Sequence, residues 1–454
     1  MRNPSGSQFH HLMVFLSLLL LPGILLAGDA TFLVSSATGF LSVSASGASV
    51  GNRIPGTLQA AREIKIKALV VTEAETVRLD RIVLVSTELF ALDDSFCSSV
   101  RRELSGKLKV PESHILLSGS LVPGAPATIP WIGSEGRNDI QEGFSRVMIR
   151  TVMAAAASDP KEVQLKIGVN HELALMENNR WILGDGRIQW SHSPSSRVRP
   201  TGMVDQELYV LGFFDRQESL HAGLFQISGR RQGGQASEKK SLLWQAGGRL
   251  ESVHDAVLLP FRGACGDATY LPGIERPESV IAGAIHGAIE ESSKADGRRV
   301  AAMIRPFEWN VRTFDEFSER GGLDMYADLI SEKEREMLAK GLSEDRKGWA
   351  SLMGEKRASW IQVMSIGEVG LVAIPGDPFS GVGMRIKNRS PFRHTLVIAG
   401  ANGWMGLLPD EEAFQLGGFE TLMGNHGFAE RDVTSQVVDQ AVDMLLELSQ
   451  QRSN

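Results

Sequence analysis

The pattern of apolar and polar residues along the chain predicts a succession of strands and helices. Glu63–Glu73 (EIKIKALVVTE) alternates apolar and charged residues and then becomes wholly apolar, which is typical of a strand. Arg81–Glu88 (RIVLVSTE) follows across a short acidic turn, so the two segments predict a pair of strands. Asp93–Leu108 begins with a capping Asp and carries apolar residues at helical spacing, which predicts a helix.

The same alternation of strands and helices continues to the end of the chain. Further strands are predicted at Ile115–Ser118, Val163–Asn170, within Glu207–Ser228 as a hairpin, at Ala256–Arg262, within Trp360–Ala373 around a turn at Gly367, and at Thr395–Asn402. Further helices are predicted at Asp139–Ser158, Leu242–His254, Pro277–Ser293, from about Pro378, and at Asp432–Gln450. The fold class expected from this order is α/β, with a mixed β-sheet core and flanking helices.

The N-terminal region, residues 1–30, predicts a secretory signal peptide. Leu12–Ala27 is apolar, is too short for a comfortable membrane span, and follows a segment whose one formally charged residue is Arg2. Small residues favour cleavage after Ala30, with Ala27 as a second candidate, and an uncleaved anchor is the alternative. No later segment is apolar enough to span a bilayer, so export to the periplasm or the exterior is expected.

Residues 31–454 are expected to form a single domain. A length of roughly 425 residues exceeds the usual ceiling of about 250–300 for one hydrophobic core, but no linker, repeat or low-complexity tract marks a boundary. The formal net charge of −7 and the scattered Lys and Arg residues argue against a nucleic-acid partner.

The two cysteines, Cys97 and Cys265, leave the redox state open. They lie far apart in sequence, so spacing alone does not decide whether they are bonded. No CxxC or HExxH spacing of metal ligands occurs in the chain.

One loop raises a question about chemistry. Ile115–Pro130 (ILLSGSLVPGAPATIP) is a buried strand that runs into a loop, and such exits commonly hold catalytic side chains. The loop part contains no His, Cys, Asp, Glu or Lys. The segment is either an ordinary loop or an active-site loop that has lost its chemistry.

Several segments, taken in order, resemble the catalytic domain of the neutral/alkaline ceramidases. These proteins are zinc amidases that cut the N-acyl bond of sphingolipids. The resembling segments are Lys67–Val71, Arg81–Leu92, Ile115–Ser120, Met203–Phe213, Ala222–Arg231, Phe261–Asp267 and Val372–Thr421. The resemblance implies a ceramidase-like α/β fold over 31–454, without the C-terminal β-domain of the full-length enzymes.

The resemblance also implies that the zinc site is degenerate. The family's His-Thr-His triplet after the strand Ile115–Ser118 falls on Leu121, Val122 and Pro123, and the next His ligand falls on Arg230. The Glu ligand falls on Asp377 and the Tyr ligand on Leu407. An isobutyl group has no lone pair, and a guanidinium stays protonated, so neither can hold zinc. No cofactor is therefore expected.

The family's catalytic Ser falls within Ala264–Tyr270, at or near Thr269. A Thr hydroxyl is a poor nucleophile without a base or a metal, and neither is evident, so Thr269 is expected to be vestigial or a turn residue. Cys265 is expected to be buried and inert rather than a thiol nucleophile.

Other residues also have structural interpretations. Asp377 directly before Pro378 is expected to cap a helix N-terminus. His171 is expected to be an ordinary surface or core residue. Trp404 either lines a cleft or anchors packing.

Two hypotheses about function follow. The first is an exported, non-catalytic ceramidase-like protein that has lost its zinc ligands and keeps the fold and a site for a lipid or acyl ligand. The alternative is an active amidase-type hydrolase with metal-free chemistry that uses Thr269, Asp377 or Cys265. An unrelated exported enzyme would explain the chain if the resemblance is fortuitous.

The substitution at Arg230 generates a specific expectation. A buried carboxylate at Asp377 would be uncompensated once a metal ion is lost, and a guanidinium can return positive charge to that place. We therefore expect an Arg230–Asp377 ion pair, buried at the position of the former metal. The alternative is that Arg230 points to solvent beside Arg231.

Overall fold

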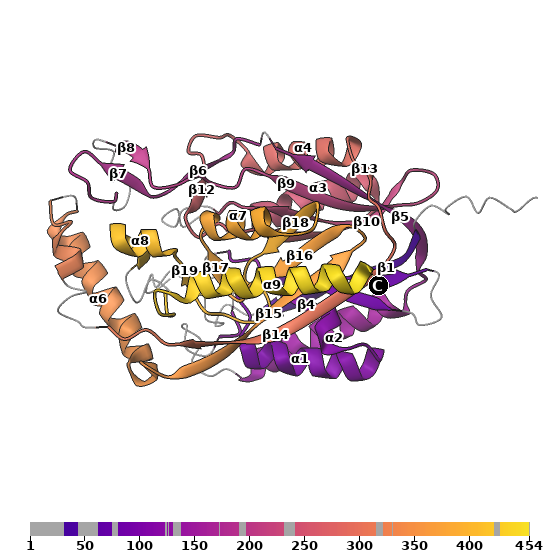
Figure 1. Cartoon of the computed structure of the whole chain (residues 1–454), viewed down its shortest axis with the longest axis horizontal. Coiled ribbons are helices and arrows are strands. Elements are labelled where there is room, and N and C mark those ends of the chain that lie inside the picture. The colour runs from indigo at the N-terminus through magenta and orange to yellow at the C-terminus, as the bar shows by residue number, and fades with distance from the viewer. Residues whose placement is uncertain are drawn as a thin grey trace, which may run out of the picture.

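The computed structural model describes residues 31–43, 62–74, 80–122, 125, 127–129, 138–171, 173–189, 197–230, 241–314, 321–328, 330–421 and 427–453. Pro123, Arg231 and the expected signal peptide lie outside these ranges. Figure 1 shows that the described part is built on two β-sheets with helices on either side.

The larger sheet holds nine described strands. Their order is β11 (Val257–Arg262), β10 (Leu220–Ile227), β9 (Leu208–Phe214), β5 (Lys161–Asn170), β1 (Thr31–Val43), β2 (Arg62–Glu73), β3 (Arg81–Thr87) and β4 (Ile115–Ser118), with β13 (Ser293–Lys294) paired to β5. The pairs β10·β11 and β3·β4 are parallel and the other pairs are antiparallel, so the sheet is mixed.

A smaller sheet packs on one face of the larger one. Its order is β14 (Val300–Asn310), β15 (Lys356–Ile366), β16 (Val369–Ala373) and β18 (His394–Ile398). Three short two-stranded sheets are formed by β6 (Met176–Asn178) with β12 (Ala268–Tyr270), β7 (Trp181–Leu183) with β8 (Arg197–Pro200), and β17 (Asp377–Pro378) with β19 (Leu407–Leu408).

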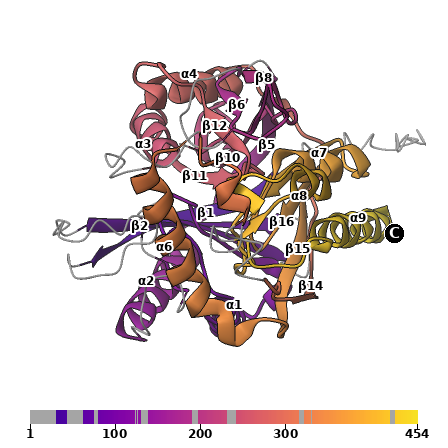
Figure 2. The same cartoon turned by 90° about the vertical axis from the view of Figure 1, so that its left-hand side faces the viewer.

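Helices cover the outer faces of both sheets. The larger sheet is covered by α1 (Asp94–Leu108), α2 (Asn138–Ala157), α3 (Leu242–His254) and α4 (Pro277–Glu290), and the smaller by α7 (Ser380–Arg389) and α9 (Val433–Ser453). Figure 2 shows α1 and α2 below, α3 and α4 above, and α9 beside the smaller sheet. The helices α6 (Glu332–Trp349) and α8 (Glu411–Leu416) lie at one end of the molecule (Figure 1).

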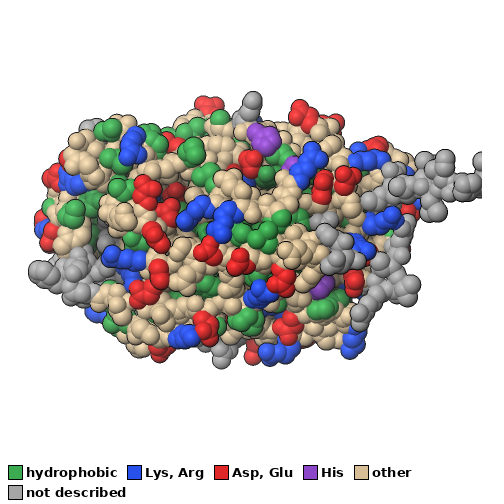
Figure 3. All heavy atoms as spheres, viewed as in Figure 1, with side chains coloured by type: hydrophobic (Ala, Val, Ile, Leu, Met, Phe, Trp, Pro, Cys, Tyr) green, Lys and Arg blue, Asp and Glu red, His purple; other side chains and the backbone are tan. Residues whose placement is uncertain are grey.

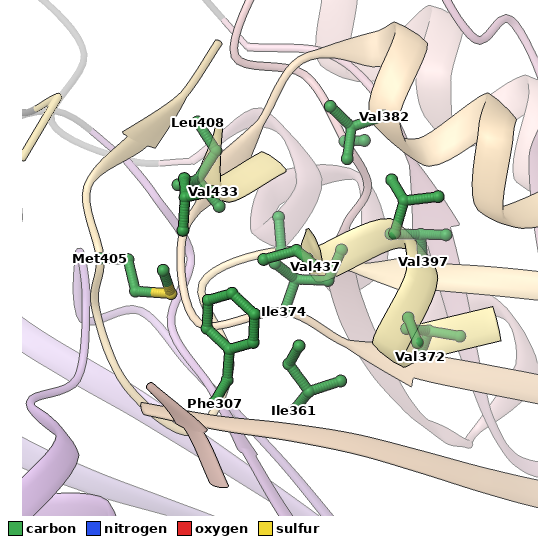
Figure 4. Packing of buried hydrophobic residues seen from close by; sticks show 14 of the residues in the cluster. Phe307, Ile361, Val372, Ile374, Val382, Val397, Met405, Leu408, Val433 and Val437 are labelled. Carbon is green, nitrogen blue, oxygen red and sulfur yellow. The ribbon is translucent and has the colours of Figure 1, made fainter. Parts of the chain in front are cut away.

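Separate apolar clusters hold these layers together. One fills the space between the two sheets, where Phe32 of β1 meets Phe213 of β9 edge to face, with ring centroids 6.3 Å apart. A second lies between the smaller sheet and its helices, where Ile361 and Val372 face Val437 of α9 (Figure 4). Because each sheet buries both of its faces, strands such as β3 and β16 are buried nearly throughout.

The larger sheet curls so that its edge strand β11 lies against β2 and β3. Lys67 Nζ of β2 donates to the Leu258 carbonyl at 3.0 Å, and Ser86 Oγ of β3 donates to the Pro260 carbonyl at 2.5 Å. Lys67 also pairs with Glu251 of α3 at 2.7 Å. Burial lowers the pKa of Lys67, and Glu251 opposes that shift. This curl brings the end of β11 toward the end of β4.

The predicted fold class is confirmed, because the sheets are mixed and are flanked by helices. The predicted strands and helices are present with small shifts at their ends. The helix predicted from about Pro378 is present as α7 and begins two residues later, at Ser380, because Asp377–Pro378 forms β17. Strands β1 and β14 and helix α6 were not predicted from the sequence. In β1 the apolar residues are diluted by Ser, Thr and Gly, which weakens the strand pattern.

The surface carries both signs of charge. Figure 3 shows Lys and Arg side chains interspersed with Asp and Glu over the face that it presents. None of the described helices combines the length and the apolar character needed to cross a membrane.

Replacing Phe32 by Ala tests the packing between the two sheets. Phe32 is fully buried, so Phe32→Ala should lower the free energy of unfolding by about 3–5 kcal/mol. Phe40 lies on the same strand and is 48% exposed, so Phe40→Ala is a matched control that should cost about 1 kcal/mol or less. Urea unfolding of both variants measures the difference, and equal losses would contradict the assignment of β1 to the core.

Candidate functional site

Three strand ends from distant parts of the sequence meet at Arg262, the last residue of β11. Arg262 Nε donates to the Ser120 carbonyl after β4 at 2.9 Å, and Nη1 donates to the Gly229 carbonyl after β10 at 2.7 Å. The Arg262 carbonyl accepts from Ala399 N after β18 at 2.8 Å. Arg262 is buried, so its guanidinium and its carbonyl hold these exits at fixed distances from one another.

Arg230 and Asp377 form an ion pair beside this junction. Arg230 Nη1 lies 3.2 Å from Asp377 Oδ2, and Arg230 Nη2 donates to the Gly266 carbonyl at 2.7 Å. The Asp377 side chain is 6% exposed and that of Arg230 is 24% exposed. The ion pair expected from the sequence is therefore present, and the alternative of Arg230 pointing only to solvent is wrong.

Leu407 and Leu121 complete the set of positions named by the sequence analysis. Leu407 lies opposite Asp377 in the parallel pair of β17 and β19, and both it and Leu121 belong to the buried cluster under α7 and α9. Leu121 has φ of 51°, a left-handed conformation that is strained for a side chain of this size. Its side chain lies against Gly400, where an added Cβ would stand 2.7 Å from Leu121 Cδ2.

Gly266 lets the loop after β11 approach the ion pair. A Cβ at this position would lie 2.7 Å from the Asp377 carbonyl oxygen and 2.9 Å from Leu407 Cδ1, so a larger residue would push β17 and β19 away. Gly266 N donates to the Pro378 carbonyl at 2.9 Å. This loop therefore contacts Arg230 through the Gly266 carbonyl and contacts β17, the strand that carries Asp377, through the Gly266 N–H.

The electrostatics of the site are set by burial and by two guanidinium groups. Burial raises the pKa of Asp377, while Arg230 and Arg262 oppose that rise. Cys265 Sγ lies 3.8 Å from Asp377 Oδ1. Burial and the neighbouring Asp377 raise the pKa of the Cys265 thiol to about 12, so the thiol stays protonated at neutral pH.

The expected capping role of Asp377 is wrong. Helix α7 begins at Ser380 after Phe379, and Asp267 supplies the acceptor for its first turn. Asp267 Oδ1 accepts from Ser380 N at 2.7 Å and from Ser380 Oγ at 2.8 Å, and Oδ2 accepts from Asn178 Nδ2 at 2.9 Å. Asp267, from a loop distant in sequence, therefore accepts the hydrogen bonds at the start of α7 that were predicted for Asp377.

The remaining candidates lie in different surroundings. Thr269 is buried in β12, and its backbone forms an isolated parallel β-bridge with Arg230. His171 is exposed, with Nδ1 3.1 Å from Glu207 Oε1. Trp404 is buried and packs edge to face on Phe90, with ring centroids 5.3 Å apart, so it acts as a packing anchor here. The two thiols, Cys97 and Cys265, are free and buried.

These residues do not fit a zinc ion. Leu121 and Leu407 have no lone pair to give to a metal. The guanidinium of Arg230 contacts Asp377, the carboxylate that would bind the metal. The donor groups that lie beside Arg230 are Asp377 and the protonated thiol of Cys265, which is 3.8 Å from Asp377 Oδ1. Within the described ranges, no group of three or more His, Cys, Asp or Glu side chains is arranged to hold a metal.

Sequence reasoning missed Arg262 and Asp267 as organisers of the site. Arg262 is the one charged residue in Ala256–Arg262, and Asp267 ends the Gly-Ala-Cys-Gly-Asp turn. A single charge at the end of an apolar strand is a usable signal, because a buried Arg requires acceptors. Its acceptors at Ser120 and Gly229 are far away in sequence and could not be named in advance.

Removing Arg230 tests the ion pair. Arg230→Ala should lower the free energy of unfolding by about 3 kcal/mol at neutral pH, because it leaves the buried Asp377 without its direct partner. The raised pKa means that the folded state holds the Asp377 proton more tightly than the unfolded state, and this stabilising effect is lost as pH rises above about 4. Loss of Arg230 raises the pKa further, so urea unfolding should show a larger defect near pH 8 than near pH 4.5.

The double variant Arg230→Ala/Asp377→Asn is the control for this prediction. It removes the stranded charge, so it should be more stable than Arg230→Ala alone and should lose the pH dependence of the defect. A single variant as stable as the wild type at pH 8 would contradict the ion pair.

Two solved structures are similar to the chain over most of its length. The crystal structure of neutral ceramidase from Pseudomonas aeruginosa matches with a TM-score of 0.67 and 15% sequence identity, covering 93% of this chain and 75% of that one. A ceramidase complexed with C2 matches with the same TM-score and identity, covering 93% of this chain and 76% of that one. No family model matches the sequence, and no curated protein matches it. The described fold of this chain is that of the neutral ceramidases.

Proposed function

We propose that the chain is a non-catalytic relative of the ceramidases in which an arginine-carboxylate pair occupies the place of the metal. The observation that carries this proposal is the contact of 3.2 Å between Arg230 Nη1 and Asp377 Oδ2. A guanidinium in that position supplies the positive charge that a buried carboxylate needs and repels a divalent cation. The function is then one of binding or structure rather than hydrolysis.

The strained backbone at Leu121 supports an origin from a functional site. A left-handed conformation at a bulky residue costs about 1–2 kcal/mol and persists only where the surroundings enforce it. Leu121 makes no polar use of this geometry, since its side chain packs against Gly400 and the buried cluster. A loop built to aim a ligand at the site accounts for that strain.

The alternative of a metal-free hydrolase has less support from the described residues. The protonated thiol of Cys265 is a poor nucleophile, and its nearest acid, Asp377, is held by Arg230. Thr269 is buried at 4% exposure within β12, which leaves little room for a substrate amide. Among the described residues, neither side chain contacts a free base of the kind that nucleophilic catalysis needs.

The ligand class follows from the fold comparison alone. Both similar structures are ceramidases, so we propose an amphipathic or acyl-chain ligand for this chain. We also propose that the chain is exported from the cytoplasm. The leader at Leu12–Ala27 supports export. Mass spectrometry of the native protein should find a terminus near Thr31, and an intact Met1 terminus would argue against a cleaved leader.

Metal analysis and an amidase assay test the main proposal. The protein is first stripped with a chelator, then loaded with added zinc, and finally exchanged into metal-free buffer. It should then retain less than about 0.1 zinc per chain, since structural and catalytic zinc sites need at least three ligands. It should release no fatty acid from a short-chain ceramide, with a neutral ceramidase as the active control. Retention of about one zinc per chain that Asp377→Asn abolishes, or amidase activity lost on chelation, would overturn the proposal.

A further inference from the structure

A pair of histidines joins α3 and α4 on the outer side of the larger sheet. His254 is the last residue of α3 and His286 lies in α4, and the two helices pack side by side (Figure 1). His254 Nε2 lies 3.3 Å from His286 Nδ1, and the ring centroids are 5.4 Å apart. Both side chains reach solvent. This pair lies apart from the junction at Arg262 and plays no part in the proposed function.

The distance between the two nitrogens matches that of two imidazoles on one tetrahedral zinc ion. With zinc–nitrogen bonds of about 2.0–2.1 Å and a tetrahedral angle, two ligating nitrogens stand about 3.3–3.4 Å apart. Square-planar or octahedral ions would require a shorter separation, of about 2.9 Å for adjacent ligands with similar bond lengths. Without a metal, the same two nitrogens share one proton in an N–H···N hydrogen bond.

The surroundings of His254 also suit a cation. Burial and the neighbouring His286 lower the pKa of His254, so this imidazole is neutral and keeps a lone pair at neutral pH. Glu290 stands one helical turn after His286 on α4 and acts electrostatically on His254. Glu251, one turn before His254, is engaged by Lys67 at 2.7 Å and by Leu258 N at 2.8 Å, so it is not available as a ligand.

We propose that His254 and His286 form a surface site for a divalent ion that prefers imidazole and tetrahedral geometry, with zinc as the best fit. Two protein nitrogens bind the ion, and water completes its coordination. When the ion binds, the proton that the two nitrogens share moves to the other nitrogen of its own ring, so both imidazoles stay neutral and each gives a lone pair to the ion. The ion then joins the end of α3 to α4. Arg249 and Glu278, 3.1 Å apart, already join the same two helices near the start of α4.

Two ligands hold zinc more weakly than the three or four of a catalytic or structural site. The ion should therefore bind when zinc is added and leave during chelation and exchange into metal-free buffer. The measurement of retained zinc therefore tests the site at Asp377, and the titration with added zinc tests the weaker site at His254 and His286.

Calorimetric titration of the purified protein with zinc chloride tests the proposal. We expect binding of about one zinc per chain at this pair, and a melting temperature higher by about 3 °C when free zinc exceeds the dissociation constant about 100-fold. His286→Ala and His254→Ala should each weaken this binding at least about 10-fold and abolish the rise in melting temperature. Both residues reach solvent, so circular dichroism should show unchanged folding.

His171→Ala is the matched control, because His171 is an exposed histidine with one carboxylate partner and should leave zinc binding unchanged. Equal binding by the wild type, His254→Ala and His286→Ala would overturn this site. Binding lost in Asp377→Asn but kept in His286→Ala would overturn both this site and the proposed function. Loss of binding in the two histidine variants alone supports the site, whatever the amidase assay shows.

Discussion

The central constraint in this structure is that the buried carboxylate of Asp377 needs partners within the protein, because it is shielded from water. Asp377 lies in a short strand between the loop after β11 and the strand β19, and its side chain is nearly fully buried. Isolated burial would cost several kcal/mol or force protonation. Arg230 makes the direct contact and Arg262 adds a second positive charge close by. The loop at Gly266 and the strand pair β17·β19 are arranged around this cluster, so the local backbone depends on how the charge is balanced.

Arg262 connects this cluster to the architecture of the sheets. Its guanidinium holds the exits of β4 and β10, and its carbonyl holds the exit of β18. These strands belong to two different sheets and to opposite parts of the larger one, so their ends meet only because that sheet curls. The buried contacts of Lys67 and Ser86 with β11 maintain the curl. Polar groups inside an otherwise apolar core therefore specify which strand ends come together.

The comparison with solved ceramidases separates fold from chemistry. The chain follows the same fold over 93% of its length at 15% identity, so most side chains can change while the layers persist. The residues at the centre then determine what the fold does. A metal needs lone pairs from three or four side chains, and two leucines with an arginine offer none. In this chain an arginine–aspartate pair lies there beside buried apolar side chains.

The sequence by itself determined the α/β class, most strand and helix positions, and the pairing of Arg230 with Asp377. The first two follow from local periodicity, and the third follows from a resemblance that placed two opposite charges at one point. The sequence did not determine that Asp267 caps α7, that β1 is a central strand, or that Arg262 joins three loops. It also gave no sign that His254 and His286 face each other. Such features depend on contacts between residues up to 142 positions apart in the chain, as between Ser120 and Arg262, and only the curl and packing of the sheets bring these partners within hydrogen-bonding distance.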